Sequence, residues 1–390
     1  MKYIIVSNYF YPEIGAASNR ITNMSCGLSS NDISVICPIP NYPQGRIFKK
    51  YKSKLYVKEK ISGVNVYRYF IYPSNSKNPL VRLLSMFSFA FSLWFFSFNY
   101  RHIMKTDKVI IQNSPFLVSL SAIILFKYVY RKKIVLNVSD LWPISAFDLG
   151  SINKGLLFTF LEKIELFMYR SSDFILGQSN EILNHVNKKV DIKTFLYRNI
   201  QPKIKTSNSK KRKNFTLVYA GLLGVAQDVY GILSNIDFKQ INIEFHIYGD
   251  GNQKLKIKNQ INTSKNKHVR YCGTLPKNQL DKIISQYHIA LVPLKNRIRG
   301  AVPSKIFELC QKKIPILFFG EGEGAEIIRK HKLGDVVSDN NYVELKKKLL
   351  FFSKLTPKDY NKYVNNCSKY SFNNINFNKQ IKELDFFLKN

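Results

Sequence analysis

Residues 301–310 have the sequence Ala301-Val302-Pro303-Ser304-Lys305-Ile306-Phe307-Glu308-Leu309-Cys310. This stretch predicts a loop that turns into a helix, because Pro303 and Ser304 are typical of a first helical turn. A helix start presents backbone N–H groups at the positive end of the helix dipole, and both favour a phosphate beside the cation of Lys305. Glu308, one turn further on, can accept hydrogen bonds from vicinal hydroxyls such as those of a ribose. Phosphate together with a diol indicates a nucleotide.

An ordinary surface helix with a capping serine is the alternative for this stretch. A capping box requires its acidic residue at the third helical position, and Glu308 lies one position beyond that site. Local capping therefore does not explain Glu308, and the rest of the chain has to decide between the two interpretations.

The size and charge of the chain limit the possible classes. Its 390 residues are too many for one ordinary core and fit two domains of similar size. Lys and Arg number 60 against 26 for Asp and Glu, which gives a formal charge of +34. This excess favours an anionic partner, either nucleic acid, an anionic membrane surface or an anionic substrate, and charge alone does not choose among them.

The five cysteines are scattered and show no C-x-x-C spacing. This pattern indicates neither a disulfide scaffold nor a zinc site, so we expect no metal and a reducing compartment. Residues 1–6 run directly into a strand-like pattern, without the long apolar core or cleavage site of a secretory signal. We therefore expect a cytoplasmic protein.

Alternating strand and helix patterns predict doubly wound α/β sheets. In the first half of the chain, strands are expected at 3–7, 33–37, 64–68, 108–112, 133–138 and 174–176. A polar, basic segment at residues 200–214 interrupts the pattern and is the best candidate for a linker. Beyond it, strands are expected at 215–219, 243–247, 269–272, 289–293 and 314–319.

Small residues are frequent in the loops after these strands, at the edge where doubly wound sheets bind ligands. Three such loops contain Tyr11-Pro12-Glu13-Ile14-Gly15-Ala16-Ala17-Ser18, Gly221-Leu222-Leu223-Gly224-Val225-Ala226-Gln227 and Gly249-Asp250-Gly251. No G-x-G-x-x-G motif is present, so each loop alone is also compatible with a simple turn. Asp140 follows another strand and precedes Trp142 and Pro143, so it either handles substrate or caps the next helix.

Two helical segments are unusually apolar. Residues 80–100 carry apolar side chains on almost every face, and residues 116–130 end in Arg131-Lys132-Lys133. The 80–100 helix is either buried between the sheet and a neighbour or lies in a membrane interface. A membrane span is the least consistent interpretation, because the strands on both sides belong to one sheet.

Taken together, the two β-α domains, the basic linker, Gly249-Asp250-Gly251 and Pro303-Ser304-Lys305-Ile306-Phe307-Glu308 resemble the family-4 glycosyltransferases of the GT-B fold. Further motifs resemble bacterial O-antigen and capsule enzymes, the closest being those assigned as L-fucosamine transferases. These motifs are Tyr11 to Arg20, Pro40-Asn41-Tyr42-Pro43, Asp140-Leu141-Trp142-Pro143 and Gly221 to Gln227.

The resemblance implies two Rossmann-like domains facing a cleft, with the acceptor held by the N-terminal domain and the nucleotide sugar by the C-terminal one. The expected organisation is an N-terminal domain at 1–199, a linker at 200–214, a C-terminal domain at 215–365 and a helical tail at 366–390. The tail is expected to cross back and pack on the N-terminal domain.

Roles follow from the resemblance position by position. Glu308 would hold the ribose, Ser304 and Lys305 the diphosphate, and Gly15 and Ala16 the donor phosphates or sugar. Asp140 would face donor or acceptor hydroxyls. The other expected donor-binding residues are Gly221, Gly224, Gln227, Gly249 and Gly251, with the two last near the base. The expected acceptor side comprises Asn19, Arg20 and Trp142.

Two departures from the family pattern affect the catalytic assignment. Many relatives carry an acid eight residues before the position of Glu308, where this chain has Gly300. Relatives also often place Arg and Lys where this chain has Leu222 and Gln227. A leaving diphosphate develops negative charge that cations must stabilise. The expected substitutes are Arg297, Arg299 and Lys305, and the residues assigned to catalysis are Asp140, Lys305 and Arg299.

The resulting expectation is a metal-independent, retaining transfer of a sugar from a nucleotide donor, UDP-linked, to a polyprenyl-diphosphate glycan. The resemblance favours an N-acetylated amino sugar such as N-acetyl-L-fucosamine, used in O-antigen (lipopolysaccharide) or capsule synthesis on the inner face of the bacterial plasma membrane. No cofactor beyond the nucleotide sugar is expected. The alternatives are a non-hydrolysing sugar-nucleotide epimerase, a non-catalytic partner of a glycan-assembly complex, and a nucleic-acid-binding protein, although no recognition module for nucleic acid is present.

Overall fold

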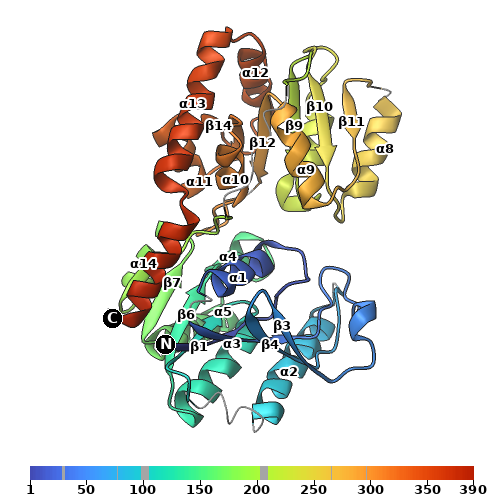
Figure 1. Ribbon diagram of the computed structural model, residues 1–390. Helices are drawn as coiled ribbons and strands as arrows, with labels where there is room; N and C mark the ends of the chain where they lie inside the picture. Colours follow the sequence, from blue (N-terminus) through green and yellow to red (C-terminus); the bar gives the residue numbers. More distant parts are fainter. Residues whose placement is uncertain (29–30, 77, 98–104, 203–209, 265, 296) are drawn as a thin grey trace. The chain divides into compact units, whose positions relative to one another are not determined.

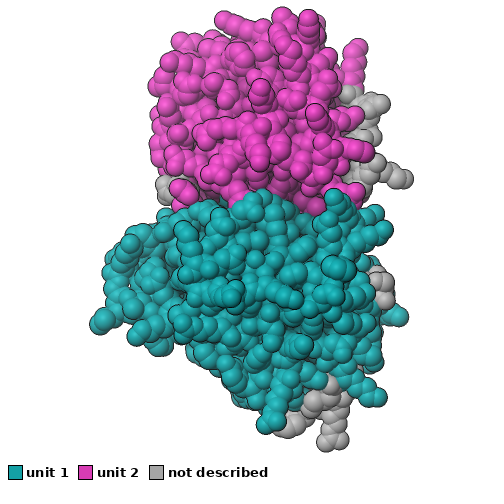
Figure 2. Space-filling model, turned by 90° about the vertical axis from the view of Figure 1, so that its left-hand side faces the viewer, with its two compact units in different colours: residues 1–199, 299–301, 378–390 teal, residues 200–298, 302–377 magenta. Residues whose placement is uncertain are grey.

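The computed structural model forms two α/β units (Figure 1). The residues that it describes are 1–28, 31–76, 78–97, 105–202, 210–264, 266–295 and 297–390. Unit 1 comprises residues 1–199, 299–301 and 378–390, and unit 2 comprises residues 200–298 and 302–377, coloured separately in Figure 2.

Unit 1 is built on an eight-stranded sheet with the order β3-β4-β2-β1-β5-β6-β7-β8, in which only β3 is antiparallel. The strands are β1 Lys2–Val6, β2 Asp32–Pro38, β3 Tyr56–Ile61, β4 Val64–Tyr69, β5 Lys108–Gln112, β6 Lys133–Val138, β7 Phe174–Gly177 and β8 Thr194–Leu196. The central strands are continuous apolar runs because helices cover both faces. The chain reverses direction across the sheet between β1 and β5, so the topological switch point lies there.

The helices of unit 1 surround this sheet (Figure 1). They are α1 Ala16–Gly27, η1 Lys49–Tyr51, α2 Pro79–Phe95, α3 Phe116–Ile123, its π-helical continuation η3 Ile124–Val129, α4 Ile144–Asp148, α5 Leu156–Arg170, α6 Asn180–Asn187 and most of α14 Phe377–Lys389. Side chains of α2, α3, α5 and α6 share one core cluster with the sheet. The C-terminal helix α14 joins unit 1 through contacts such as Asp385 with Asn31 and Phe387 with Phe174.

The apolar helix expected at 80–100 is neither fully buried nor a span. In α2, Phe89, Ala90 and Leu93 are buried, whereas Phe91 and Phe95 are 68% and 62% exposed. Interpretation as a helix enclosed between the sheet and a neighbour is therefore wrong for the described part of the chain, where only one side of α2 is buried. Residues 98–100 of the expected helix lie outside the described residues. Among the described helices, none has both the length and the hydropathy needed to cross a bilayer.

Unit 2 contains a six-stranded parallel sheet with the order β11-β10-β9-β12-β13-β14. The strands are β9 Thr216–Ala220, β10 Glu244–Tyr248, β11 Val269–Tyr271, β12 Ile289–Leu294, β13 Ile316–Gly320 and β14 Gly334–Val337. Its helices are η4 Val225–Gln227, α7 Val229–Asn235, α8 Lys254–Ser264, α9 Lys277–Ile283, η5 Ile284–Gln286, α10 Lys305–Gln311, α11 Glu323–His331, α12 Tyr342–Ser353 and α13 Pro357–Asn374. Two core clusters lie on its two faces, and the switch point is between β9 and β12.

Two segment boundaries differ from expectation. Cys367 and Tyr370 are buried in the core of unit 2, so the part of the tail that belongs to unit 1 begins at Asn378 rather than at residue 366. The described end of the expected linker packs on unit 2, where Lys211 Nζ donates to the carbonyl oxygen of Tyr287 and Arg212 stacks on the Tyr287 ring. Residues 203–209 of that linker lie outside the described residues.

Candidate active site

In unit 2, loops converge at the carboxyl ends of β9 and β12, the switch point where doubly wound sheets bind ligands. Residues 221–228 follow β9, residues 249–253 follow β10, and the loop from Lys295 leads into α10. Most residues expected to bind the donor lie on these loops.

Gly249 and Gly251 are required by the close approach of two backbones. A Cβ atom at Gly249 would lie 1.7 Å from the carbonyl oxygen of Gly221, and one at Gly251 would lie 2.3 Å from that of Leu223. Gly249 also has a φ of +136°, which other residues rarely adopt. Hydrogen bonds from Gly221 N to Tyr248 O (3.0 Å) and from Leu223 N to Asp250 O (2.8 Å) join the loops. The two glycines thus allow the loops after β9 and β10 to pack as one surface.

Lys305 lies over this surface. A Cβ atom built on Gly221 would be 3.1 Å from Lys305 Cε, so the structure brings these two expected donor-binding residues together. Ser304 is the N-cap residue of α10, and its side chain makes no capping hydrogen bond. A hydroxyl and an ammonium group therefore stand at the start of α10, beside the glycine loop.

Glu308 is half-buried, one turn after Ser304. Together with Lys305, Asp281 and Lys312 it lines a cavity of about 20 Å³, which is large enough for a water molecule but not for a nucleoside. Burial lowers the pKa of Lys312, and the attraction of Asp281 and Glu308 acts against that shift. A nucleotide at α10 would therefore lie outside this cavity, with Glu308 at its margin.

A group that the sequence did not reveal fixes the loop after β9. Asp228 is buried in a left-handed conformation, with a φ of 45°. Lys295 Nζ lies 3.2 Å from Asp228 Oδ1, and the Tyr342 hydroxyl donates to Asp228 Oδ2 at 2.5 Å. The three residues come from distant segments without a shared motif, so no local signal could have identified them.

Gln227 and Gly224 lie next to each other at η4. A Cβ atom at Gly224 would be 2.7 Å from Gln227 Oε1, which is buried and has no hydrogen-bond partner among the described residues. Leu222 and Val225 are 59% and 62% exposed on the same loop. The loop therefore presents an apolar surface at the position where relatives often carry cations.

The basic loop before α10 does not present all of its cations in the expected way. Arg297 is exposed, but the guanidinium of Arg299 is bound by both carboxylate oxygens of Asp148, with Nη2 at 2.7 Å from Oδ1. Hydrogen bonding to Asp148 raises the pKa of Arg299. Because this carboxylate already compensates the charge, the contacts of Arg299 do not favour the diphosphate-binding role expected of it.

Gly300 shows why an acid does not fit at its position. Its φ is +81°, and a Cβ atom there would lie 2.7 Å from Ile182 Cγ1. Its N–H donates to Glu181 Oε2 at 2.9 Å, and its carbonyl oxygen accepts from Ser179 Oγ at 2.8 Å. An acid at this position, as in the paired-carboxylate form of the motif, would therefore be strained in this backbone and would require Ile182 to move.

In unit 1, the loop after β1 leads to Gly15, the N-cap residue of α1, and to the exposed Ala16. The Tyr42 ring lies against Gly15, since a Cβ atom there would be 3.3 Å from Tyr42 Cε1. Asn199 Nδ2 donates to the carbonyl oxygen of Ala16 at 3.2 Å, and Asn19 is half-buried in the first turn of α1. Ala16 is therefore accessible to a ligand, whereas the Tyr42 ring limits the space beside Gly15.

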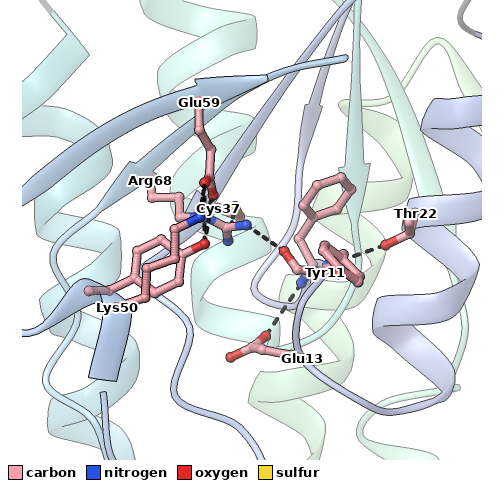
Figure 3. Close-up of polar contacts among 9 residues, drawn as sticks. Tyr11, Glu13, Thr22, Cys37, Lys50, Glu59 and Arg68 are labelled. Carbon is pink, nitrogen blue, oxygen red and sulfur yellow. Dashed lines mark hydrogen bonds and ion pairs between the residues drawn. The ribbon is translucent and has the colours of Figure 1, made fainter. Parts of the chain in front are cut away.

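Glu13 and Arg68, which had no assigned role, hold this loop in place (Figure 3). The buried Glu13 carboxylate accepts hydrogen bonds from the backbone N–H groups of Asn41 at 2.8 Å and Tyr42 at 2.9 Å. Arg68, on β4, donates to the carbonyl oxygen of Tyr11 and, through Nε, to Glu59 Oε1 at 2.6 Å. Through these hydrogen bonds, the two side chains fix the backbone of the loop.

Arg20, expected on the acceptor side, is buried rather than presented to a ligand. It donates to Asn137 Oδ1 at 2.5 Å and Gln178 Oε1 at 3.1 Å, and it lies 5.2 Å from the centre of the Tyr197 ring. Burial lowers its pKa to about 10. The contacts place Arg20 in a polar network beneath the carboxyl edge of the sheet. The expected direct contact of Arg20 with the acceptor is therefore wrong, and its role is to support the residues above it.

Asp140 is exposed at this edge, and Ser139 Oγ donates to its Oδ2 at 3.4 Å. Protein atoms that crowd Asp140 raise the pKa of its carboxyl group, while Ser139 and Arg20 act in the opposite direction. The capping alternative is not supported, because the N-cap residue of α4 is Pro143. Trp142 is half-buried and packs on Phe116, with ring centres 4.6 Å apart.

Two Rossmann-like sheets, each with loops at its switch point, are the architecture of the GT-B fold, and a glycosyltransferase family model matches the C-terminal part of the chain. Residues 200–371 match the family model described as "Glycosyl transferases group 1". No curated protein gives a significant match. The domain that carries Lys305 and Glu308 is therefore of the group 1 glycosyltransferase type.

Solved structures share the fold over the whole chain. Sucrose-phosphate synthase from Thermosynechococcus elongatus has a TM-score of 0.75 at 8% identity, covering 100% of this chain and 98% of that one. Anabaena Alr3699/HepE in complex with UDP has a TM-score of 0.71 at 11% identity, with 100% of both chains covered. WaaG, a glycosyltransferase involved in lipopolysaccharide biosynthesis, has a TM-score of 0.65 at 12% identity and 99% coverage of both chains. The GT-B fold expected from the sequence is thus confirmed.

Proposed function

We propose that this glycosyltransferase moves a sugar from a UDP-linked donor to a lipid-linked oligosaccharide. The observation that carries the donor assignment is the position of Lys305 over Gly221 at the switch point of unit 2. Glu308 follows in the first turn of α10, and we assign it to the ribose hydroxyls. Neighbouring structures that contain UDP support the choice of nucleotide.

The reaction that we propose breaks the bond between the sugar C1 and the diphosphate oxygen and forms a bond from C1 to an acceptor hydroxyl oxygen. The ammonium group of Lys305 and the hydroxyl of Ser304 would stabilise the charge that develops on the diphosphate. The acceptor proton would pass to a diphosphate oxygen, while Asp140 orients a donor or acceptor hydroxyl. No metal is assigned to this step, and retention of configuration is proposed from the family resemblance.

For the acceptor we propose a glycan on polyprenyl diphosphate, met at the inner face of the bacterial plasma membrane. The sugar that we propose is an N-acetylated amino sugar such as N-acetyl-L-fucosamine, used in O-antigen or capsule synthesis. Support comes from the sequence motifs that resemble such enzymes and from the fold shared with WaaG. The acceptor side would include Asn19 and Trp142, with Arg20 beneath them.

A panel of nucleotide sugars tests this proposal when each is incubated with the protein and a membrane lipid extract and the release of free UDP or GDP is followed. Lys305→Ala should lower turnover about 100-fold, as expected for losing one group that stabilises the transition state. Lys256→Ala, an exposed lysine on α8, serves as the matched control. Unchanged turnover in Lys305→Ala would remove Lys305 from the mechanism. The anomeric configuration of the product, measured by NMR, tests retention.

A non-hydrolysing epimerase or a non-catalytic partner of a glycan-assembly complex remains the alternative. The pairing of Arg299 with Asp148 and the exposed Leu222 favour the non-catalytic alternative, since both reduce the positive charge offered to a diphosphate. An epimerase would convert the free nucleotide sugar without an acceptor. A non-catalytic partner would bind UDP without releasing it from any donor in the panel.

A further inference from the structure

One side of unit 1 exposes an unusual number of large apolar side chains. In α2, Leu80, Leu84, Phe87, Phe91 and Phe95 recur at spacings of three and four residues and are 53–73% exposed. This spacing places them along one side of the helix. Soluble monomers seldom expose a contiguous apolar strip of this kind, so the strip calls for a partner.

The strip continues over the two neighbouring helices. Trp94 Nε1 of α2 donates to Ser121 Oγ of α3 at 3.0 Å, which joins the first two helices. On η3, Tyr128 stacks on Phe167 of α5, with ring centres 5.9 Å apart. In α5, Phe160 is 59% exposed. We use the term apolar face for the exposed side chains of α2, η3 and α5.

The charges around the apolar face are almost all positive. Residues 79–95 and 116–129 contain no Asp or Glu. Arg82 is exposed within α2, and Arg131 is exposed directly after η3. On α2 and η3 the surface therefore combines apolar and basic side chains without acids, whereas α5 carries the half-buried Glu162 next to the exposed Lys163.

A basic hollow adjoins the end of this face. Arg170 lies one turn after Phe167 and lines a hollow of about 740 Å³ together with Lys133, Lys189 and Lys193. Two acids line the hollow: Asp173, which binds Lys127 at 2.8 Å, and the exposed Asp191. The buried Glu165 binds Lys189 at 2.6 Å. Positive charge remains in excess, which suits the phosphates of lipid headgroups.

We propose that the apolar face docks unit 1 on an anionic bilayer. Aromatic side chains such as Phe91, Phe95 and Tyr128 would enter the headgroup boundary, and the basic hollow would lie against lipid phosphates. The arrangement is that of an interfacial surface, in which apolar side chains enter the boundary and basic groups stay with the headgroups. The inference deepens the proposed function, because it identifies the surface through which a lipid-linked acceptor is approached.

Charge complementarity distinguishes this occupant from a second copy of the chain. Two copies meeting through this face would bring Arg82, Arg131 and Arg170 of each toward the same residues of the other, without acids on the helices α2 and η3 to compensate. An anionic bilayer offers both an apolar interior and a compensating charge.

Sedimentation with vesicles tests the proposal on the full chain. Phosphatidylcholine vesicles with 30% phosphatidylglycerol should bind the wild-type protein at least tenfold more tightly than phosphatidylcholine alone, because each basic group near an anionic surface adds about 1 kcal/mol. Phe91→Ser with Phe95→Ser should weaken binding to both vesicles about tenfold or more. Arg170→Gln with Lys193→Gln should weaken binding to the anionic vesicles about tenfold and leave binding to neutral vesicles unchanged.

Phe372→Ser is the matched control, because Phe372 is 86% exposed on α13 of unit 2. The proposal would be overturned if the wild-type protein and both double variants bound the vesicles with equal affinity. It would also be overturned if the wild-type protein dimerised with increasing concentration and the Phe91/Phe95 variant did not. UDP release with a water-soluble acceptor analogue is measured in parallel and should not change in these variants. Vesicle binding without sugar transfer would contradict the proposed function but not the docking face. Sugar transfer without vesicle binding would contradict the docking face but not the proposed function.

Discussion

The Glu13 carboxylate accepts a hydrogen bond from the backbone N–H of Asn41 at 2.8 Å, and so joins the loop after β1 to the loop after β2. The same oxygen accepts a hydrogen bond from the backbone N–H of Tyr42, and the Tyr42 ring lies against Gly15. Burial raises the pKa of Glu13, and these backbone hydrogen bonds oppose that shift. A buried acid that only binds backbone groups has a positioning role.

Glu13→Ala should lower the free energy of unfolding by about 2 kcal/mol, because buried N–H groups lose their acceptor. It should also raise KM for the donor, since Tyr42 and Gly15 would no longer be held together. Glu13→Gln keeps one acceptor oxygen and should leave both the free energy of unfolding and the KM for the donor close to the wild-type values. Denaturant unfolding and initial-rate kinetics measure them. Equal effects of the two variants on KM would contradict the positioning role.

Arg68 and its partners allow a sharper test of stability in unit 1. The Arg68 side chain is buried and bound to Glu59, whereas Lys50 binds the same carboxylate from solvent at 3.2 Å. Arg68→Met should cost about 1–3 kcal/mol, because the Tyr11 carbonyl oxygen and the half-buried Glu59 carboxylate lose a charged donor. Lys50→Met should leave the unfolding midpoint nearly unchanged. Similar shifts of the midpoint in the two variants would show that burial does not decide the strength of these ion pairs.

Gly249→Ala should disrupt the two loops of unit 2 that we propose to bind the donor. Its Cβ atom would overlap the Gly221 carbonyl oxygen, so the loops after β9 and β10 must separate. Gly273→Ala is the matched control, because Gly273 also has a positive φ, of +78°, but open space around it. The control should cost about 1–2 kcal/mol through backbone strain alone. Gly249→Ala should cost more and abolish UDP binding measured by calorimetry, while Gly273→Ala retains it.

Two histidines of unit 2 should make stability fall in mild acid. Desolvation by burial lowers the pKa of both His246 and His288 from 6.5 to about 4. The Thr216 backbone N–H donates to His288 Nδ1 at 3.1 Å, so this nitrogen is unprotonated in the folded state. Because the unfolded chain takes up protons first, the contribution of these two histidines to stability is constant above about pH 6.5 and falls as the pH drops from 6.5 toward 4.

The free energy of unfolding lost through protonation of His246, which is 5% exposed, is on the order of 3 kcal/mol at the acid end of this window. Denaturant unfolding between pH 7.5 and 4.5 measures it. His246→Gln should narrow the difference in stability between pH 7 and pH 5 relative to the wild-type chain. A variant that shows the same pH dependence as the wild-type chain would refute the assignment.

The sequence was a good guide to the fold because, apart from β3, the strands of both sheets are parallel. Parallel strands such as β5 and β12 are buried on both faces, and they appear in the sequence as short apolar runs separated by helices. The strand β3 was missed because it lies at the sheet edge and alternates between exposed and half-buried residues. The loops at the strand ends, and with them Lys305 and Gly221, were located from the same pattern.

The contacts within the site were less predictable. Arg20 has the sequence context of a ligand-binding residue, but its guanidinium is buried among Asn137, Gln178 and Tyr197, which lie more than 110 residues away. Arg299 is bound by Asp148, and Asp228 by Lys295 and Tyr342, again from distant segments. Partners of a charged group depend on which segments the sheet order brings together, and local patterns contain no such information.

The amino-acid sequence alone predicted the two α/β sheets and the loops at their strand ends, because period, glycine spacing and strand ends are local properties. The glycosyltransferase class was predicted from the resemblance of its motifs to a known family. Tertiary structure decided which cations a carboxylate binds, which side of α2 is buried, and why a side chain at Gly300 would be strained. The physical reason is that burial and charge compensation depend on neighbours supplied by segments far apart in the chain.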